Sequence, residues 1–195
     1  RRRHTRLQGD WSSDVCSSHL LNTYRDRLCV VQLSAGDGDA HIVHFPSAKY
    51  DAPNLQKLLT DNNINKIFHF ARFDIAILQH YLKIKVNNVY CTKIVSRLAR
   101  TYTDHHGLKD LCSELLKVNI SKNQQSSNWG RETLSEAQLK YAAQDVLYLH
   151  QLKDILNEML VKEGRMHLAE SCFKFLATRV ELDLLGWYDV DIFQH

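Results

Sequence analysis

The chain has 195 residues, and 44% of them are hydrophobic, which is enough for one domain with a substantial core. Its formal net charge is only +3, so a nucleic acid that it binds is not held by bulk charge alone. No apolar run approaches the roughly 20 residues of a membrane span, and the basic start lacks the apolar segment of a signal peptide. We therefore expect a cytoplasmic protein that does not enter the membrane.

The five cysteines are scattered along the chain without a CxxC pair. An odd, widely spaced set is typical of reduced thiols, so we expect neither a disulfide framework nor a zinc site. The cysteines are Cys16, Cys29, Cys91, Cys112 and Cys172.

A small sheet is predicted in the first half of the chain. Two runs with β-branched residues, at 27–34 and 39–45, are joined by the sequence AGDG, which favours a hairpin. Helical and extended patterns then alternate, with Thr92 as a candidate cap of the helix after the last strand. They predict a helix over 52–62, a strand over 66–70, a helix over 71–82 and a strand over 88–92.

Helices alone are predicted in the second half, over 108–117, 135–162 and 165–178. The apolar residues of the second of these helices advance by three or four positions and form one face. They are Ala142, Val146, Leu149, Leu152, Leu156 and Leu160. The expected fold is therefore a single α/β domain, a small mixed sheet flanked by helices with a helical C-terminal half.

Two acids and a tyrosine are candidates for chemistry. Asp74 follows a hydrophobic strand in the first turn of a helix, where the helix dipole alone also favours a carboxylate. Asp145 lies one turn after Tyr141 beside the apolar face, where it either flanks the face in solvent or binds a partner. Two carboxylates near a phenol suit a pair of divalent ions that clamps the oxygens of a phosphodiester, with the tyrosine orienting a water molecule.

Two stretches carry a family resemblance. The sequences KIFHFARFDIAIL and ISKNQQSSNWGRETLSEAQLKYAAQDVLYLHQL resemble the second and third motifs of ribonuclease D, in the tyrosine branch of the DEDD 3′–5′ exonucleases. The resemblance implies a ribonuclease H-like fold, two Mg²⁺ or Mn²⁺ ions and hydrolysis of phosphodiester bonds from RNA 3′ ends. It assigns Asp74 and Asp145 as metal ligands and Tyr141 as the residue that orients water.

The first motif of this family, Asp-x-Glu at the end of a strand, is missing. Counting back from the second strand places its acids at Val15 and Ser17. Neither Asp10 nor Asp14 has the required spacing or a preceding apolar strand, so we expect no substitute. The expected consequence is an enzyme that lacks its first strand and is impaired.

The start of the chain has an unusual composition. Written back into codons, DWSSDVCSSHL at 10–20 resembles a common sequencing-adapter oligonucleotide, except at His19. We therefore expect residues 1–20 to be non-native and the exonuclease domain to span residues 21–195. The alternative is a divergent natural N-terminus.

Other candidates contact substrate or only support the fold. His69 precedes Asp74 at a spacing similar to that of the family, which suits the border of the site, and Phe73 suits stacking on a terminal base, although both also fit a core. Lys122 and Gln125 are candidates for contact with RNA. Trp129 suits RNA contact and packing equally. We expect RNA 3′ ends as substrate, tRNA precursors among them, and no obligate protein partner. The alternatives are an inactive nucleic-acid-binding domain and a DNA 3′–5′ exonuclease.

Overall fold

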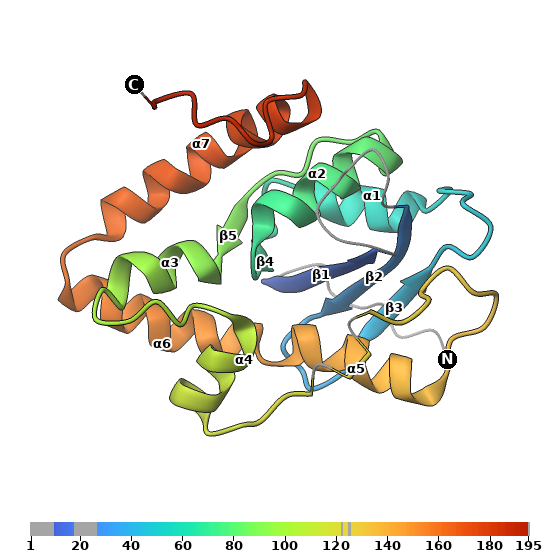
Figure 1. Ribbon diagram of the computed structural model, residues 1–195, viewed down its shortest axis with the longest axis horizontal. Coiled ribbons are helices and arrows are strands. Elements are labelled where there is room, and N and C mark those ends of the chain that lie inside the picture. Colours follow the sequence, from blue (N-terminus) through green and yellow to red (C-terminus); the bar gives the residue numbers. More distant parts are fainter. Residues whose placement is uncertain (1–9, 18–26, 122, 125, 195) are drawn as a thin grey trace.

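The protein is described by a computed structural model that covers residues 10–17, 27–121, 123–124 and 126–194, with the backbone alone at 15–17 (Figure 1). Figure 1 shows a central sheet with α1 and α2 on one side and α5 on the other. This arrangement confirms the predicted α/β class. None of the helices described is both long and apolar enough to cross a bilayer.

The sheet is mixed and has five strands in the order β3-β2-β1-β4-β5. The first three strands pair antiparallel, whereas β1 and β5 both run parallel to β4. The strands are β1 (Trp11–Ser17), β2 (Leu28–Ser34), β3 (His41–His44), β4 (Lys66–Phe68) and β5 (Val89–Cys91).

Most helices match the predicted ranges. The long helix predicted over 135–162 is broken at Tyr148, and the one predicted over 108–117 ends in a π-helical segment, Cys112–Leu116. The last helix extends to Leu184. The helices are α1 (Pro53–Thr60), α2 (Ala71–Leu82), α3 (Thr92–Ala99), α4 (Leu108–Leu111), α5 (Glu136–Leu147), α6 (Leu149–Lys162) and α7 (Met166–Leu184).

The expectation that the first strand is missing is wrong for the structure, because β1 fills the centre of the sheet. Trp11 is 7% exposed, and Ser12 and Ser13 are fully buried. A strand in this place is bonded to β2 on one side and β4 on the other, so its backbone groups are satisfied without apolar alternation. The ladder compensates for a sequence that offers little to bury. The origin of residues 1–20 stays a prediction.

The core covers both faces of the sheet. One cluster joins β1 and β2 to α1, α2 and α7, and a second joins β4 and β5 to α3 and α6. The predicted apolar face of residues 142–160 is confirmed, because all six side chains are fully buried despite the break at Tyr148. The four cysteines whose side chains are described, Cys29, Cys91, Cys112 and Cys172, are free thiols, as expected.

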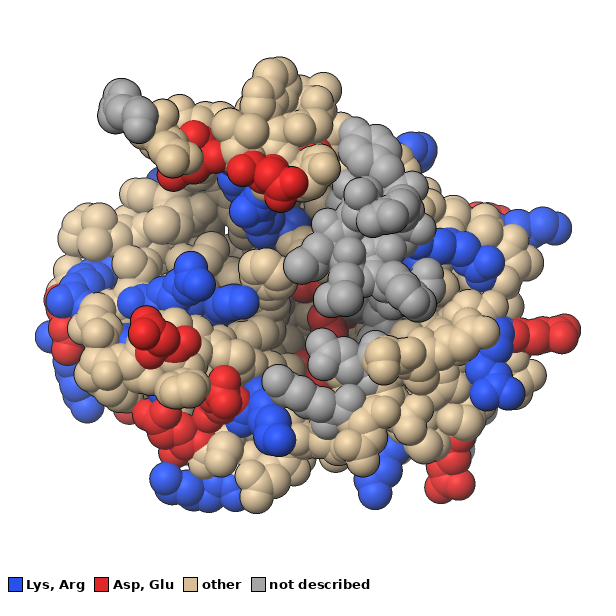
Figure 2. Space-filling model, in the orientation of Figure 1, with Lys and Arg blue, Asp and Glu red and all other residues tan. Residues whose placement is uncertain are grey.

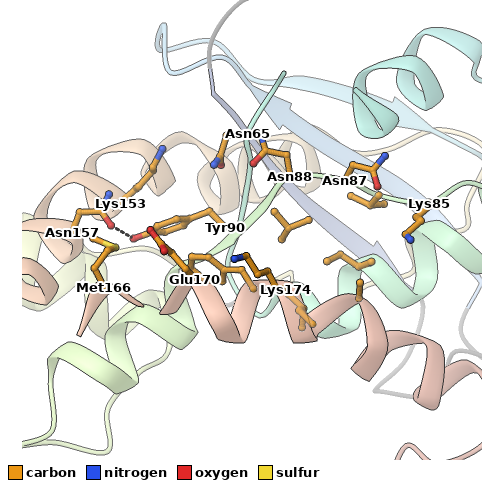
Figure 3. A pocket seen from close by; sticks show the side chains of 16 residues that line it. Asn65, Lys85, Asn87, Asn88, Tyr90, Lys153, Asn157, Met166, Glu170 and Lys174 are labelled. Atoms are coloured by element: carbon orange, nitrogen blue, oxygen red, sulfur yellow. Dashed lines mark hydrogen bonds between the residues drawn. The ribbon is translucent and has the colours of Figure 1, made fainter. Parts of the chain in front are cut away.

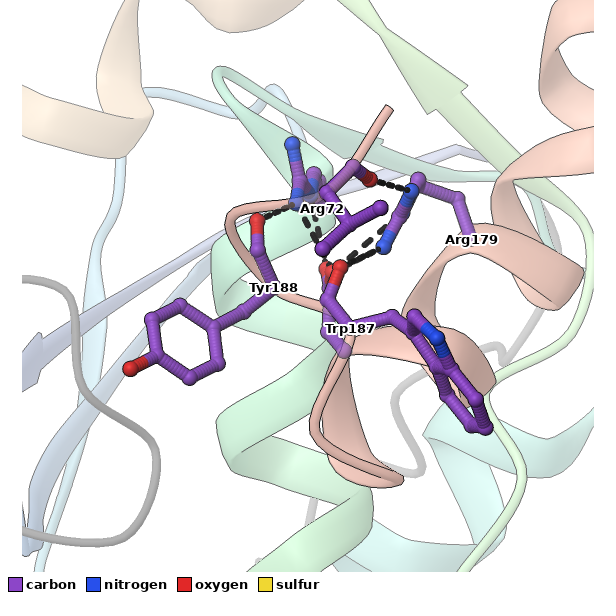
Figure 4. Close-up of polar contacts among 6 residues, drawn as sticks. Arg72, Arg179, Trp187 and Tyr188 are labelled. Carbon is purple, nitrogen blue, oxygen red and sulfur yellow. Dashed lines mark hydrogen bonds and ion pairs between the residues drawn. The ribbon is translucent and has the colours of Figure 1, made fainter. Parts of the chain in front are cut away.

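An arginine–aspartate cluster connects the C-terminal part of the chain to the start of α2 (Figure 4). The Arg72 guanidinium donates to both carboxylate oxygens of Asp183, at 2.6 and 2.7 Å. Arg179 donates to the same carboxylate at 2.8 Å and to the carbonyl of Trp187. Arg72 also donates to the carbonyl of Tyr188 at 2.7 Å. The first turn of α2 is therefore fixed to the end of α7.

Candidate active site

The turn from β4 into α2 places Asp74. Phe70, the residue before α2, adopts a left-handed conformation with φ of 69°. A bulky residue rarely adopts this conformation, and strain of this kind concentrates at functional sites. The turn lets α2 begin directly after the carboxyl end of β4, so that Asp74 is held in the first helical turn with 4% of its surface exposed.

The pKa of Cys91, at the end of β5, is affected by the charge of Asp74. Burial is the main cause that raises the pKa of this thiol, and the negative charge of Asp74 raises it further. Asp74 is thus a buried carboxylate close to the carboxyl ends of β4 and β5. A surface acid that only favours the helix dipole does not fit this burial.

His69 lies at the same end of the sheet. Its Nδ1 is 2.9 Å from the hydroxyl oxygen of Thr92, and that hydroxyl donates to the carbonyl of Phe68 at 3.2 Å. The Thr92 oxygen is then free to accept from Nδ1–H, which leaves Nε2 as the acceptor of a neutral imidazole. Burial and then the charge of Lys93 lower the pKa of His69 to about 3. Thr92 is the first residue of α3, so its predicted role as a side-chain cap is wrong.

The aromatic residues beside Asp74 differ in exposure. Phe73 is half-buried and packs against the core, which supports its interpretation as a packing residue. Phe70 is 39% exposed, and Lys93 Nζ lies 4.0 Å from the centre of its ring. Neither Phe70 nor Lys93 was predicted from the sequence. An aromatic residue next to His69 and a lysine next to Thr92 were the available signals.

The start of α5 orients Tyr141. Ser135 and Gln138 form a capping box, and the Gln138 amide also donates to the hydroxyl of Ser127 and the carbonyl of Asn128. These bonds fix the preceding loop, in which Trp129 is 1% exposed with its ring centre 5.9 Å from that of Tyr141. Trp129 is therefore a packing residue that supports the tyrosine.

Asp145 lies one turn after Tyr141 and has an acidic neighbour. Its pKa lies well above the usual range of a carboxyl group, first because the side chain is buried, and second because the charge of Asp14 and a hydrogen bond to Asp14 favour the protonated form. Burial and the charge of Asp145 together raise the pKa of Cys112 to about 12. Asp14 was not expected to substitute for a first-motif acid, yet β1 brings it next to Asp145.

The acids at this site have oxygen donors of the kind that a divalent cation prefers. Two half-buried carboxylates side by side suit a hard cation, which would replace the shared proton. Asp74 is on α2, and both α2 and α5 contact β1, the strand that carries Asp14. Within the described residues, however, no group of three or more His, Cys, Asp or Glu side chains is arranged to hold a metal ion. Lys122 and Gln125 lie outside the part of the chain that is described.

Acidic charge is concentrated at one place on the surface rather than spread over a whole face. Figure 2 shows acidic atoms within a hollow at the centre of one face, with Lys and Arg side chains around it. Basic and acidic residues alternate over the rest of this face, in keeping with the net charge of +3. The hollow, not a broad basic surface, is the distinctive feature.

Comparison with known proteins gives consistent results. A family described as 3′–5′ exonuclease matches residues 16–161. A solved structure of NrnC from Brucella melitensis with bound Mg²⁺ is 55% identical, with a TM-score of 0.92 over 96% of this chain and 91% of that chain. A structure of the same protein bound to pGG is 56% identical, with the same coverage and TM-score.

Ribonucleases D are more distant and longer. The one from Gluconacetobacter diazotrophicus is 34% identical over 144 residues, which is 74% of this chain and 36% of that protein. The chain thus spans about a third of the length of such relatives. The structure of Escherichia coli RNase D is 22% identical with a TM-score of 0.79, a likeness of fold that confirms the ribonuclease H-like architecture. From its third motif, its fold and the matched residues, this chain belongs to the 3′–5′ exonuclease family.

Proposed function

We propose that the protein is a metal-dependent 3′–5′ exoribonuclease that hydrolyses phosphodiester bonds from RNA 3′ ends. The observation that carries this proposal is the half-buried, hydrogen-bonded pair of Asp145 and Asp14, with Tyr141 one helical turn away. A carboxyl group whose pKa is raised by a second acid is a group that a divalent cation converts to its charged form.

Each residue then has a distinct role. Asp74 and Asp145 would hold Mg²⁺ or Mn²⁺, with Asp14 as a further oxygen ligand beside Asp145. Two bound ions supply a clamp for the attacking and leaving oxygens of the phosphodiester. The Tyr141 hydroxyl orients the attacking water, and Trp129 keeps the phenol in place. His69 offers Nε2 as an acceptor near the substrate, and Phe73 stabilises the fold around Asp74.

The substrate class is supported by relatives. Proteins of 28–34% identity are named ribonuclease D, and NrnC of Brucella melitensis has been solved with pGG. We propose RNA 3′ ends as substrates, including tRNA precursors and short oligonucleotides. DNA 3′ ends are the alternative within the same chemistry.

One observation favours a second candidate, a catalytically inactive nucleic-acid-binding domain. The family resemblance places the first two acids of the motif near positions 15 and 17, which are Val15 and Ser17 in this chain. Asp14 supplies only part of the missing charge, so we propose that hydrolysis by this chain is impaired.

The test uses a chain in which the family-like strand Ile-Ala-Ile-Asp-Thr-Glu replaces residues 12–17, because Val15→Asp alone would place an acid on the strand face opposite to Asp14 and Asp145. Adding Asp145→Asn to it should abolish shortening of a labelled RNA in Mg²⁺ or Mn²⁺, because an amide keeps the shape but loses the anionic ligand. Tyr141→Phe should be milder, within the roughly 10²–10⁴-fold range of groups that assist proton transfer. Circular dichroism provides the control for folding, and a DNA of the same sequence tests the choice of sugar. Unchanged turnover in Asp145→Asn would refute the proposed mechanism.

A further inference from the structure

A cavity of about 510 Å³ lies away from the candidate active site, between the sheet and α7 (Figure 3). Asn65 precedes β4, and Asn87 and Asn88 precede β5, so the cavity is at the amino ends of these parallel strands. Asp74 follows the carboxyl end of β4, so it lies at the opposite ends of these strands from the cavity. The volume is within the range of about 300–1,000 Å³ that is usual for small-molecule sites.

The inner part of the cavity is aromatic and apolar. Tyr90 is buried, and its ring centre lies 5.1 Å from that of Phe173 on α7. Val86, Met166 and Leu176 also line the cavity. A flat heteroaromatic ring can exclude water from these surfaces by packing against them.

Two amide side chains provide hydrogen bonds of opposite kind. Asn65 Oδ1 is buried, yet nothing in the described part of the chain donates a hydrogen bond to it. Asn157 accepts from the Tyr90 hydroxyl through Oδ1 at 2.8 Å, which leaves its amide N–H groups to donate elsewhere. A buried acceptor without a donor is costly unless something fills the role. An acceptor together with a donor matches the edge of a nucleobase, as amide side chains do with adenine.

The entrance is positively charged. Lys85, Lys153 and Lys174 line the cavity with one acid, Glu170. Lys153 forms an ion pair with Asp10, and its Nζ lies 5.4 Å from the centre of the Tyr90 ring. Lys85 and Lys174 are exposed, and neither takes part in a salt bridge between described residues. Two lysines without a carboxylate partner at the rim of an apolar cavity suit a phosphate group.

We propose that this cavity is a second site that binds a nucleoside 5′-monophosphate, with the base between Tyr90 and the two amides and the phosphate at Lys85 and Lys174. The site is separate from the acids that the proposed function uses. Its occupancy does not require hydrolysis, and its failure would leave the proposed function intact.

Calorimetric titration of the full chain in EDTA tests the proposal, because chelation prevents metal-dependent binding at the candidate active site. AMP should bind at least 10-fold more tightly than adenosine or inorganic phosphate alone. The double variant K85E/K174E should weaken AMP binding at least 10-fold. The double variant K109E/K162E changes the net charge equally at two exposed lysines outside the cavity, and it should bind AMP as the unmodified chain does.

A second variant tests recognition of the base. Asn65→Leu removes the buried acceptor, so AMP affinity should fall while the melting temperature stays equal or rises. Equal AMP affinity in K85E/K174E and K109E/K162E would overturn the proposal. Binding of phosphate as tight as that of AMP would also overturn it, since the cavity would then be an anion site without recognition of a base.

Discussion

The neighbouring strands β1 and β2 each have seven residues and pair antiparallel at the centre of the sheet, but different forces hold them. Every residue of β2 is buried, and its side chains enter the cores on both faces. In the part of β1 whose side chains are described, Trp11 joins the core, two serines are buried and Asp14 is half-buried. Side-chain burial therefore stabilises β2 along its whole length, whereas β1 beyond Trp11 depends more on backbone bonds, to β2 along the strand and to β4 at its start.

The difference shows how a sheet can carry polar residues of a candidate active site on a central strand. A central strand that is bonded on both sides can carry polar residues, because the ladder continues whatever the side chains are. Its neighbour then has to supply the apolar contacts. In this protein β1 brings an acid to Asp145, and β2 provides the packing around it.

Removing packing from β2 should have the largest effect. Leu28 is fully buried, so Leu28→Ala should lower the free energy of unfolding by about 2–5 kcal/mol. Urea denaturation followed by circular dichroism measures it. A loss well under 1 kcal/mol would mean that β2 is no more dependent on its side chains than β1.

Restoring the acids of β1 should change activity more than stability. With residues 12–17 replaced by the family-like strand Ile-Ala-Ile-Asp-Thr-Glu, hydrolysis of a labelled RNA in Mg²⁺ should accelerate at least about 100-fold, equivalent to roughly 2.7 kcal/mol of barrier. Both chains are assayed at equal concentration, with denaturation curves as the control. Comparable shortening by both would show that Val15 and Ser17 are no handicap.

Asp14 should make stability depend on pH in a way that β2 does not. The folded pKa of Asp145 exceeds its unfolded value near 4, so as pH rises the unfolded chain releases this proton first and stability falls. In EDTA, Asp14→Asn should reduce the loss between pH 4.5 and 8 by on the order of 1 kcal/mol, because one cause of the raised pKa is removed. Added Mg²⁺ should restore stability at pH 8 in the unmodified chain. Parallel pH curves for the two chains would disprove the coupling.

The two buried serines of β1 should respond in opposite directions. Ser12 Oγ lies 2.9 Å from the carbonyl of Val146 and 3.2 Å from that of Ser34, so Ser12→Ala should cost about 1 kcal/mol. Ser13 Oγ is buried without a hydrogen-bond partner in the described part of the chain, so Ser13→Ala should gain up to about 1 kcal/mol. The melting temperatures of Ser12→Ala and Ser13→Ala, compared with that of the unmodified chain, measure the two effects. Destabilisation by both substitutions would mean that the Ser13 hydroxyl is satisfied.

Apolar spacing predicted the elements from β2 onward because their stability comes from burial, which leaves a pattern in the sequence. The ladder that holds β1 leaves no such pattern, so both the strand and the position of Asp14 were missed. The break at Tyr148 was missed for a similar reason, since the apolar face continues through it. Asp145 and Tyr141 were identifiable because an acid beside an apolar face requires a partner. The contact between Phe70 and Lys93 depends on the left-handed backbone conformation of Phe70, which the spacing of apolar residues does not predict.

The cluster of Arg72, Arg179 and Asp183 makes two distant parts of the chain open together. Separating the end of α7 from α2 would leave the carboxylate of Asp183, which is 5% exposed, without its two cations, and a buried charge without partners is strongly unfavourable. Helix ends usually fray independently of the rest of a fold, but this end is part of one cooperative unit with the first turn of α2. Amide protons near residue 183 and near Asp74 should therefore exchange in the same opening event, and the geometry around Asp74 should be as durable as the C-terminal contacts.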